Sequence, residues 1–200
     1  MSASPIPKEH VVSTENFVEK QGNILEREKH PLENTWCLWL NTNMSNNFKE
    51  NQINITAFDT VEDFWCLYHH AKLPSELNSG QDYSMFKKSI SPMWEDEANK
   101  RGCRLVILFE KRQFAEMDRM WLDAILMCIG ENFNNLNHLI TGIVVNIKPK
   151  NNKNKISVWL ADKKNKKDNI FIGNILKSAL GISWKLNFHP HDSREIIYTC

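Results

Sequence analysis

The chain has 200 residues, of which 42% are hydrophobic and 24% charged, and its formal net charge at pH 7 is +1. These values are typical of one folded soluble domain with a sizeable core, and they exclude a global positive field that attracts nucleic acid. No apolar run approaches the ~20 residues needed to cross a bilayer, and the N-terminus lacks the pattern of a signal peptide. The five cysteines have an odd count and no close pairs, which favours free thiols in a reducing compartment over disulfides or a zinc site.

The predicted elements follow from the apolar periodicity, in chain order. Residues 1–29 are polar and weakly patterned, and we interpret them as a flexible N-terminal segment with a helical turn near Phe17–Lys20. The folded domain is predicted to cover residues 30–200. Short apolar runs predict strands at Trp36–Leu40, Ile53–Phe58, Cys103–Glu110, Gly142–Lys148, Ile156–Ala161 and Trp184–Phe188. Helical spacing predicts helices at 61–71, Phe114–Ile129 and 173–180.

The start of the first helix carries a capping signal, because Thr60 is followed three residues later by Asp63. Strands come in neighbouring pairs with helices between them and do not alternate strictly with helices. This order favours the α+β class with one mainly antiparallel sheet.

Both longer helices carry more apolar surface than one core face requires. In the longer helix the predicted core face is Phe114, Met117, Trp121, Ala124, Ile125 and Cys128, and a second stripe is Leu122, Leu126 and Ile129. In the shorter helix the core face is Phe64, Tyr68 and Ala71, with Val61 and Trp65 toward its edge. Either other parts of the domain cover the extra stripes, or they form a groove for a partner's amphipathic helix.

Trp94 and Glu95 place a large flat ring beside a carboxylate, in a segment without strand or helix period. Guanine has a flat face on which an aromatic ring can stack. Its Watson–Crick edge has two adjacent N–H donors that a carboxylate can accept. The pair therefore favours a guanine-binding site, and the neighbouring Asp96 and Glu97 are interpreted as polar loop residues.

A basic cluster lies between residues 148 and 167, where eight lysines face one aspartate, Asp162. Strand alternation places Lys155, Ser157 and Trp159 on one face of the strand at Ile156–Ala161. Lysines beside an exposed ring suit the phosphates of a stacked nucleotide. We interpret Lys163–Lys167 as a solvated loop, with a nuclear-import signal as the alternative.

The chain resembles the translation initiation factor 4E family, whose members bind the 7-methylguanosine cap of messenger RNA. The resemblance extends from about residue 30 to residue 185 and implies a single curved, mainly antiparallel sheet of about eight strands. Three helices would pack on its convex side, and the cap would lie on its concave side. The resembling stretches, in family order, are HPLENTWCLWL (30–40), FDTVEDFWCLYHH (58–70), PMWEDEANKRG (92–102), DRMWLDAILMCIGENF (118–133), GIVVNIK (142–148) and KISVW (155–159).

The resemblance implies a role for particular residues of the cap site. Trp94 matches the ring that stacks on the methylated guanine, Glu95 the carboxylate that accepts from its N–H groups, and Trp159 the ring near the N7-methyl group. Phe48 matches the second stacking ring, which is usually tryptophan in the family. The residues implied for the cap phosphates are Lys148, Lys150, Lys153, Lys155 and the supporting Arg104.

The resemblance also implies a partner surface across the helices. It would bind the motif YxxxxLφ of a 4G-type initiation scaffold or of 4E-binding repressor proteins. The matching residues are His30, Pro31, Val61, Trp65, Leu122, Asp123, Leu126 and Ile129. Both extra apolar stripes fall within this set.

Three departures from the family pattern bear on affinity. Phenylalanine at position 48 offers a smaller face and a weaker quadrupole than indole, so we predict weaker cap binding than in typical relatives. Lys148 stands where the family has an arginine, and lysine lacks the bidentate fork. The tail after Phe188 shows no match to the family's C-terminal loop.

The predicted function is therefore cap binding and recruitment of a scaffold to start translation, by a monomer without cofactor. The alternative is a repressor that competes for the cap or sequesters partners. An enzyme is not expected, because the chain has no nucleophile elbow, phosphate-binding loop or metal-spaced cluster, and His69, His70, His189 and His191 are expected to be solvent-exposed. We expect a cytoplasmic protein without membrane contact, with entry into the nucleus as a further option.

Overall fold

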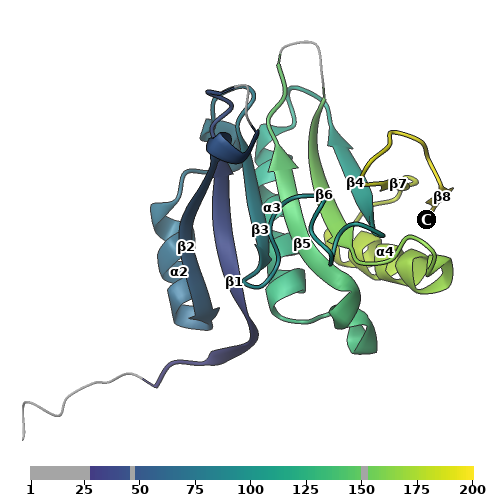
Figure 1. Ribbon diagram of the computed structural model, residues 1–200, viewed down its shortest axis with the longest axis horizontal. Coiled ribbons are helices and arrows are strands. Elements are labelled where there is room, and N and C mark those ends of the chain that lie inside the picture. The colour runs from purple at the N-terminus through teal and green to yellow at the C-terminus, as the bar shows by residue number, and fades with distance from the viewer. Residues whose placement is uncertain (1–27, 46–47, 150–152) are drawn as a thin grey trace, which may run out of the picture.

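The computed structural model describes residues 28–45, 48–149 and 153–200. Eight strands form one curved sheet in the order β2-β1-β3-β5-β6-β4-β7-β8, and every neighbouring pair is antiparallel (Figure 1). The strands are β1 (Pro31–Asn41), β2 (Gln52–Thr60), β3 (Asp82–Lys87), β4 (Cys103–Phe109), β5 (Ile140–Asn146), β6 (Asn154–Leu160), β7 (Asn187–Pro190) and β8 (Tyr198–Thr199).

Three α-helices in the described part of the chain lie on one side of this sheet, as Figure 1 shows. They are α2 (Val61–His70), α3 (Phe114–Ile129) and α4 (Lys166–Leu180), with short 3-10 turns η1 (Phe48–Asn51), η2 (Pro74–Glu76) and η3 (Asn134–Leu139). The α+β class with one antiparallel sheet and three helices on its convex side is thus confirmed. No described helix is long and apolar enough to span a membrane.

Strand alternation separates an apolar face from a polar one. On β6, Ile156, Val158 and Leu160 are fully buried against the helices, where they join the hydrophobic core. Lys155 and Trp159 lie on the opposite face and are partly exposed. The prediction for this strand is therefore confirmed, and the concave face of the sheet is the one that offers polar and aromatic groups to a ligand.

Several element boundaries differ from the predictions. β3 was not predicted, because its alternation of Asp82 and Ser84 with Tyr83 and Met85 covers only four residues before Phe86 interrupts it. α4 begins at Lys166, seven residues before the predicted start, since its first turn is polar (residues 166–169). β7 lies later than the predicted strand at 184–188. The turn near Phe17–Lys20 and nearly all of the predicted flexible segment lie outside the described residues.

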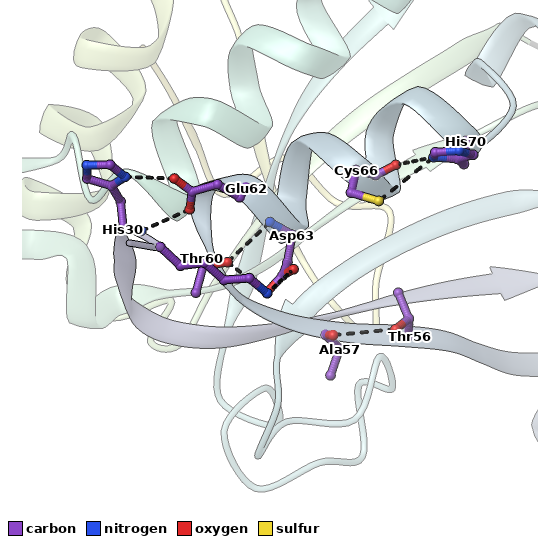
Figure 2. Close-up of polar contacts among 9 residues, drawn as sticks. His30, Thr56, Ala57, Thr60, Glu62, Asp63, Cys66 and His70 are labelled. Carbon is purple, nitrogen blue, oxygen red and sulfur yellow. Dashed lines mark hydrogen bonds and ion pairs between the residues drawn. The ribbon is translucent and has the colours of Figure 1, made fainter. Parts of the chain in front are cut away.

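Thr60 caps α2 as its spacing predicted. Its hydroxyl oxygen accepts from the backbone N–H of Asp63 at 3.2 Å and donates to the Asp63 carboxylate at 2.7 Å (Figure 2). Lys29 donates to the same carboxylate, and together these bonds lower the pKa of Asp63. The beginning of the helix is therefore tied to the chain that leads into β1.

Candidate functional site

The strand register places two of the predicted site residues, Trp159 and Arg104, in one row that crosses the strands of the concave face. Phe86 on β3 lies opposite Gly142 on β5, which lies opposite Trp159 on β6. Trp159 in turn pairs with Arg104 on β4. Because directly opposed residues of antiparallel strands share a face, this row brings an aromatic cluster next to a cation.

Gly142 gives the aromatic row its close packing. A Cβ atom at this position would lie 2.4–2.6 Å from the Phe86 ring, so any side chain there would displace the phenylalanine. Because Gly142 has no side chain, the Phe86 ring reaches across β5 and contacts the Trp159 ring edge-to-face, with ring centroids 5.2 Å apart and planes at 81°. Such edge-to-face contacts favour one orientation of the indole.

Two neighbouring cavities open on this face. The larger has a volume of about 700 Å³, and the smaller about 230 Å³. Arg104 and Lys155 line both. The larger is lined by Arg104, Val106, Leu108, Lys148, Pro149, Lys153, Lys155, His189 and Arg194. The smaller is lined by Asn41, Gln52, Asp82, Ser84, Pro92, Met93, Trp94, Arg104, Val144, Asn146, Lys155, Ser157, Trp159 and His191.

The larger cavity is strongly basic. Burial, together with the charges of Arg104 and Lys148, lowers the pKa of Lys155 to about 8. Asp82 is the acidic residue of the adjoining smaller cavity, and burial raises its pKa although both lysines oppose the shift. An anion entering the larger cavity would relieve the mutual repulsion of its cations.

Trp94 lines the smaller cavity from the loop after β3, and it is 46% exposed although it is a large apolar residue. The loop is held by two neighbouring polar residues. Asp96 accepts from the backbone N–H of Ser91 at 2.9 Å, and the buried Asn99 donates to the carbonyls of Ser91 and Met93 at 3.1 and 2.9 Å. Asp96 is thus a polar loop residue, as interpreted from the sequence, and the exposed ring has a fixed support.

Glu95 follows Trp94 at the rim and is exposed, but it is not among the residues that line the smaller cavity. Phe48 begins η1, and its side chain lies outside the described part of the structure. Lys150 is also outside the described residues. The other predicted phosphate contacts, Lys148, Lys153, Lys155 and Arg104, come together around the larger cavity, where Lys153 also forms an ion pair with Glu110.

From the sequence, the tail after Phe188 was not matched to the family's C-terminal loop, but the structure places it against this site. Arg104 donates to the carbonyls of Pro190, His191 and Ser193 at 2.6, 2.9 and 2.8 Å. The tail therefore lies against the sheet and contributes Arg194 to the larger cavity. Of the predicted phosphate residues, Arg104 has three N–H groups already engaged by the tail.

His191 corrects a prediction from the sequence, since it is not solvent-exposed. Its ring stacks on Trp159, with centroids 3.9 Å apart and planes at 26°, and it lines the smaller cavity. His189 is partly buried and lines the larger one. Periodicity missed both residues because their positions depend on β7 pairing with β4, a contact across more than 80 residues.

A second candidate surface lies on the helices. α2 and α3 pack side by side, and residues from both line a cavity of only about 20 Å³ between them. Val61 is 38% exposed, and Trp65, Leu122, Asp123 and Leu126 are partly exposed.

The indole of Trp65 lies among the aromatic side chains of α2. It stacks on His69 at 5.7 Å and meets Tyr68 edge-on at 6.0 Å. This packing presents the indole on the helix surface.

Two side chains of α3 depart from the predicted stripes. Ile129 is 4% exposed and belongs to the core, so its side chain is not part of the exposed helix surface. Phe114, predicted to face the core, is 41% exposed because it is the first residue of the helix, at the edge of the packed region. The other five predicted core residues of α3 are buried, which confirms the main stripe.

His30 and Pro31 lie beside this surface, where β1 meets the beginning of α2. The His30 backbone N–H and its Nδ1 atom contact the two carboxylate oxygens of Glu62 at 2.9 and 2.7 Å (Figure 2). These contacts lower the pKa of Glu62 to about 2. The chain entering β1 is thus fixed next to Val61.

Comparisons with known proteins agree with this geometry. The family model described as eukaryotic initiation factor 4E matches residues 31–196. The chain is 50% identical over 153 residues to eukaryotic translation initiation factor 4E1 of Drosophila melanogaster, covering 76% of this chain and 58% of the fly protein. It is 43% identical over 181 residues to eukaryotic translation initiation factor 4E-1A of Danio rerio, covering 90% and 79% of the two chains.

Solved structures show the same fold. C. elegans eIF4E-3, in complex with the 4E-binding protein Mextli and a cap analog, superimposes with a TM-score of 0.80 and 34% identity, covering 86% of this chain and 100% of that one. Ascaris suum eIF4E-3 with an m7G cap gives a TM-score of 0.79 and 36% identity, covering 86% and 96%. The curved sheet backed by helices is therefore a fold that these relatives share.

Proposed function

Because this chain belongs to the eukaryotic initiation factor 4E family, we propose that it binds the 7-methylguanosine cap of messenger RNA and recruits a YxxxxLφ-containing scaffold to start translation. One observation carries the proposal. A small cavity lined by Trp94 and Trp159 adjoins a larger basic cavity, and both are lined by Arg104 and Lys155. The cap likewise joins a methylated base to a triphosphate, so the base would fit the smaller cavity and the triphosphate the larger one.

The base would bind by stacking and by hydrogen bonds. N7-methylation gives guanine a positive charge, so stacking on the indole of Trp94 gains a cation–π contribution of roughly 1–2 kcal/mol when desolvated. Glu95 would accept from the two N–H groups of the Watson–Crick edge, and Trp159 would contact the methyl group. Phe48 would close the opposite side of the base, with a smaller ring and hence a weaker contact than tryptophan.

The triphosphate would occupy the larger cavity. Its walls carry the cations Arg104, Lys148, Lys153, Lys155 and Arg194. Charge-assisted hydrogen bonds from lysine and arginine to phosphate oxygens are roughly twice as strong as neutral ones. Because Lys155 is desolvated beside other cations, a phosphate there would restore a favourable environment for its charge.

Calorimetric titration with m7GTP tests the base site. Stacking is worth about 1–3 kcal/mol per base, so Trp94→Ala should weaken binding roughly 5- to 150-fold. Glu95→Gln keeps the side-chain size but places an N–H₂ group opposite the guanine donors, and it should also weaken binding. Trp184→Ala is the matched control, because Trp184 is 42% exposed and lines neither cavity. Equal affinities for all four proteins would contradict the cap site.

The helix surface around Trp65 would bind the scaffold. C. elegans eIF4E-3 is solved with the 4E-binding protein Mextli, and a schistosome eIF4E is solved with 4E-BP. An amphipathic helix carrying YxxxxLφ would place its apolar residues on Val61, Trp65, Leu122 and Leu126. His30 and Pro31 would border it, and Asp123 would offer a charge at its rim.

A second candidate function is repression by competition for the cap or by sequestering partners. Phe48 favours this alternative, because a weaker cap site leaves the helix surface unaffected. Retention on a cap-analogue resin, with elution by m7GTP but not by GTP, would separate cap binding from repression by sequestration alone, because a protein that only sequesters partners would not be retained. We further propose that the protein acts as a monomeric binding factor in the cytoplasm and not as an enzyme, with nuclear import through Lys163–Lys167 as a separate question.

A further inference from the structure

The ring of Trp159 is fixed from two directions. Phe86 on β3 contacts the Trp159 ring edge-to-face. The His191 ring, from the C-terminal tail, stacks on the Trp159 ring with centroids 3.9 Å apart and planes at 26°. Trp159 and His191 both line the smaller cavity, in which we place the methylated base. The tail thus contributes an aromatic group to the base pocket itself.

His191 acts through the face of its ring. Both ring nitrogens are buried, and neither forms a well-aligned hydrogen bond among the described residues, although the nearby Leu160 backbone opposes the lowering of the ring's pKa. Burial, and next the charge of Arg104, lowers the pKa of His191 to about 3, so the ring is neutral at physiological pH. Burying a polar ring whose hydrogen bonds are poorly formed costs free energy, and stacking on Trp159 helps to offset this cost.

The surrounding chain is shaped to hold this ring. Arg104 donates to the His191 carbonyl and to that of Pro190, which fixes the backbone on both sides of the residue. Gly102 provides the space for the ring, since a Cβ atom there would lie 2.7 Å from His191 Nε2 and 2.1 Å from the Leu160 carbonyl oxygen. A glycine at the end of the loop that carries Trp94 therefore allows the tail to reach Trp159.

We propose that His191 is a positioning residue of the base pocket, which fixes the plane of Trp159 and thereby contributes, beside the cation–π contact on Trp94, to the preference for an N7-methylated base over an unmethylated one. The inference rests on the proposed cap binding. A methyl group gains from an aromatic ring only at van der Waals contact, and dispersion falls steeply once a gap of 0.5–1 Å opens. An indole free to tilt would lose that contact, whereas stacking of the base on Trp94 would be unchanged.

The test compares the affinities of the full chain for m7GTP and for GTP by calorimetry. His191→Ala removes the stack, and His191→Leu fills the volume without an aromatic face. Aromatic pairs contribute enough for the ratio of the two affinities to fall about three- to tenfold in both variants. His191→Phe should keep the wild-type ratio, because the aromatic stack persists. His138→Ala is the control, since His138 is exposed and contacts only the Asn135 carbonyl among the hydrogen bonds found.

Thermal unfolding and binding of a YxxxxLφ peptide are measured on the same proteins. If the alanine variant loses affinity for m7GTP, GTP and the peptide alike, His191 has only a structural role and the proposal is overturned. A wild-type preference for m7GTP that persists in all variants overturns the proposal and leaves cap binding intact. A wild-type protein without that preference overturns the proposed function itself, together with this inference.

Discussion

Replacing Arg104 by methionine should release the C-terminal tail. Three hydrogen bonds from the guanidinium to the carbonyls of Pro190, His191 and Ser193 would be lost. Each hydrogen bond to a charged group contributes about 1.5–3 kcal/mol to stability when its partner would otherwise stay buried and unpaired. Because the freed carbonyls of the tail regain water, about 1 kcal/mol net for each bond is the better value here. The free energy of opening the tail should therefore fall by about 3 kcal/mol, which corresponds to a roughly 150-fold increase in the equilibrium constant for opening.

Hydrogen exchange of the tail amides measures this opening directly. The N–H groups of Ile197 and Cys200 are suitable reporters, because they donate to the carbonyls of Phe188 and Leu186 at 2.9 and 3.1 Å. In the variant both should exchange about 100 times faster, whereas the amide of Val145 in the central sheet should keep its protection.

Arg119→Met is the matched control for this experiment. Arg119 forms an exposed i,i+4 ion pair with Asp123, and such pairs contribute about 0.3–0.5 kcal/mol. Arg104→Lys keeps the positive charge but cannot reach three carbonyls with one ammonium group, so it should resemble the methionine variant. Unchanged exchange at Ile197 and Cys200 in Arg104→Met would refute the reasoning that the guanidinium holds the tail.

Three further predictions concern the two proposed binding sites. Trp65→Ala should abolish binding of a YxxxxLφ peptide and leave m7GTP affinity unchanged; loss of both in fluorescence titrations would show that the residue is structural. Phe48→Trp should raise m7GTP affinity severalfold in calorimetry, because indole has a larger face and a stronger quadrupole, and the absence of any gain would refute the predicted weakness of this site. Burial and neighbouring cations lower the pKa of Lys155 to about 8. The protonated form binds anions, so affinity for inorganic triphosphate should fall between pH 7 and 9, and Lys155→Arg should flatten this profile; identical profiles would contradict the assignment.

The fold was largely predictable because most elements bury one face. The main stripe of α3 and the two faces of β6 follow from periodicity, which burial imposes on the sequence, and the cap at Thr60 follows from the spacing of Thr60 and Asp63. β3 was missed because its polar and apolar residues alternate over only four positions, Asp82 to Met85, before Phe86 interrupts the pattern. β8 was missed because a strand of two residues forms only where β7 offers an unpaired edge.

Some residues of the candidate site could likewise be predicted from the sequence, and others could not. Trp94, Glu95 and Lys155 could be proposed from local chemistry, since a ring beside a carboxylate and a lysine on the face of a strand are features of neighbouring residues. The contribution of the tail could not be predicted. His191 reaches Trp159 only because Arg104 binds the tail carbonyls and Gly102 leaves the space.

By itself, the sequence determined the fold class and the class of ligand, because both depend on the spacing and chemistry of residues that are close along the chain. Only the tertiary structure decided which rings and cations meet in one site, and that Ile129 is buried while His191 lines the smaller cavity. The physical reason is that strand register and the partly buried hydrogen bonds of Arg104 join segments more than 80 residues apart.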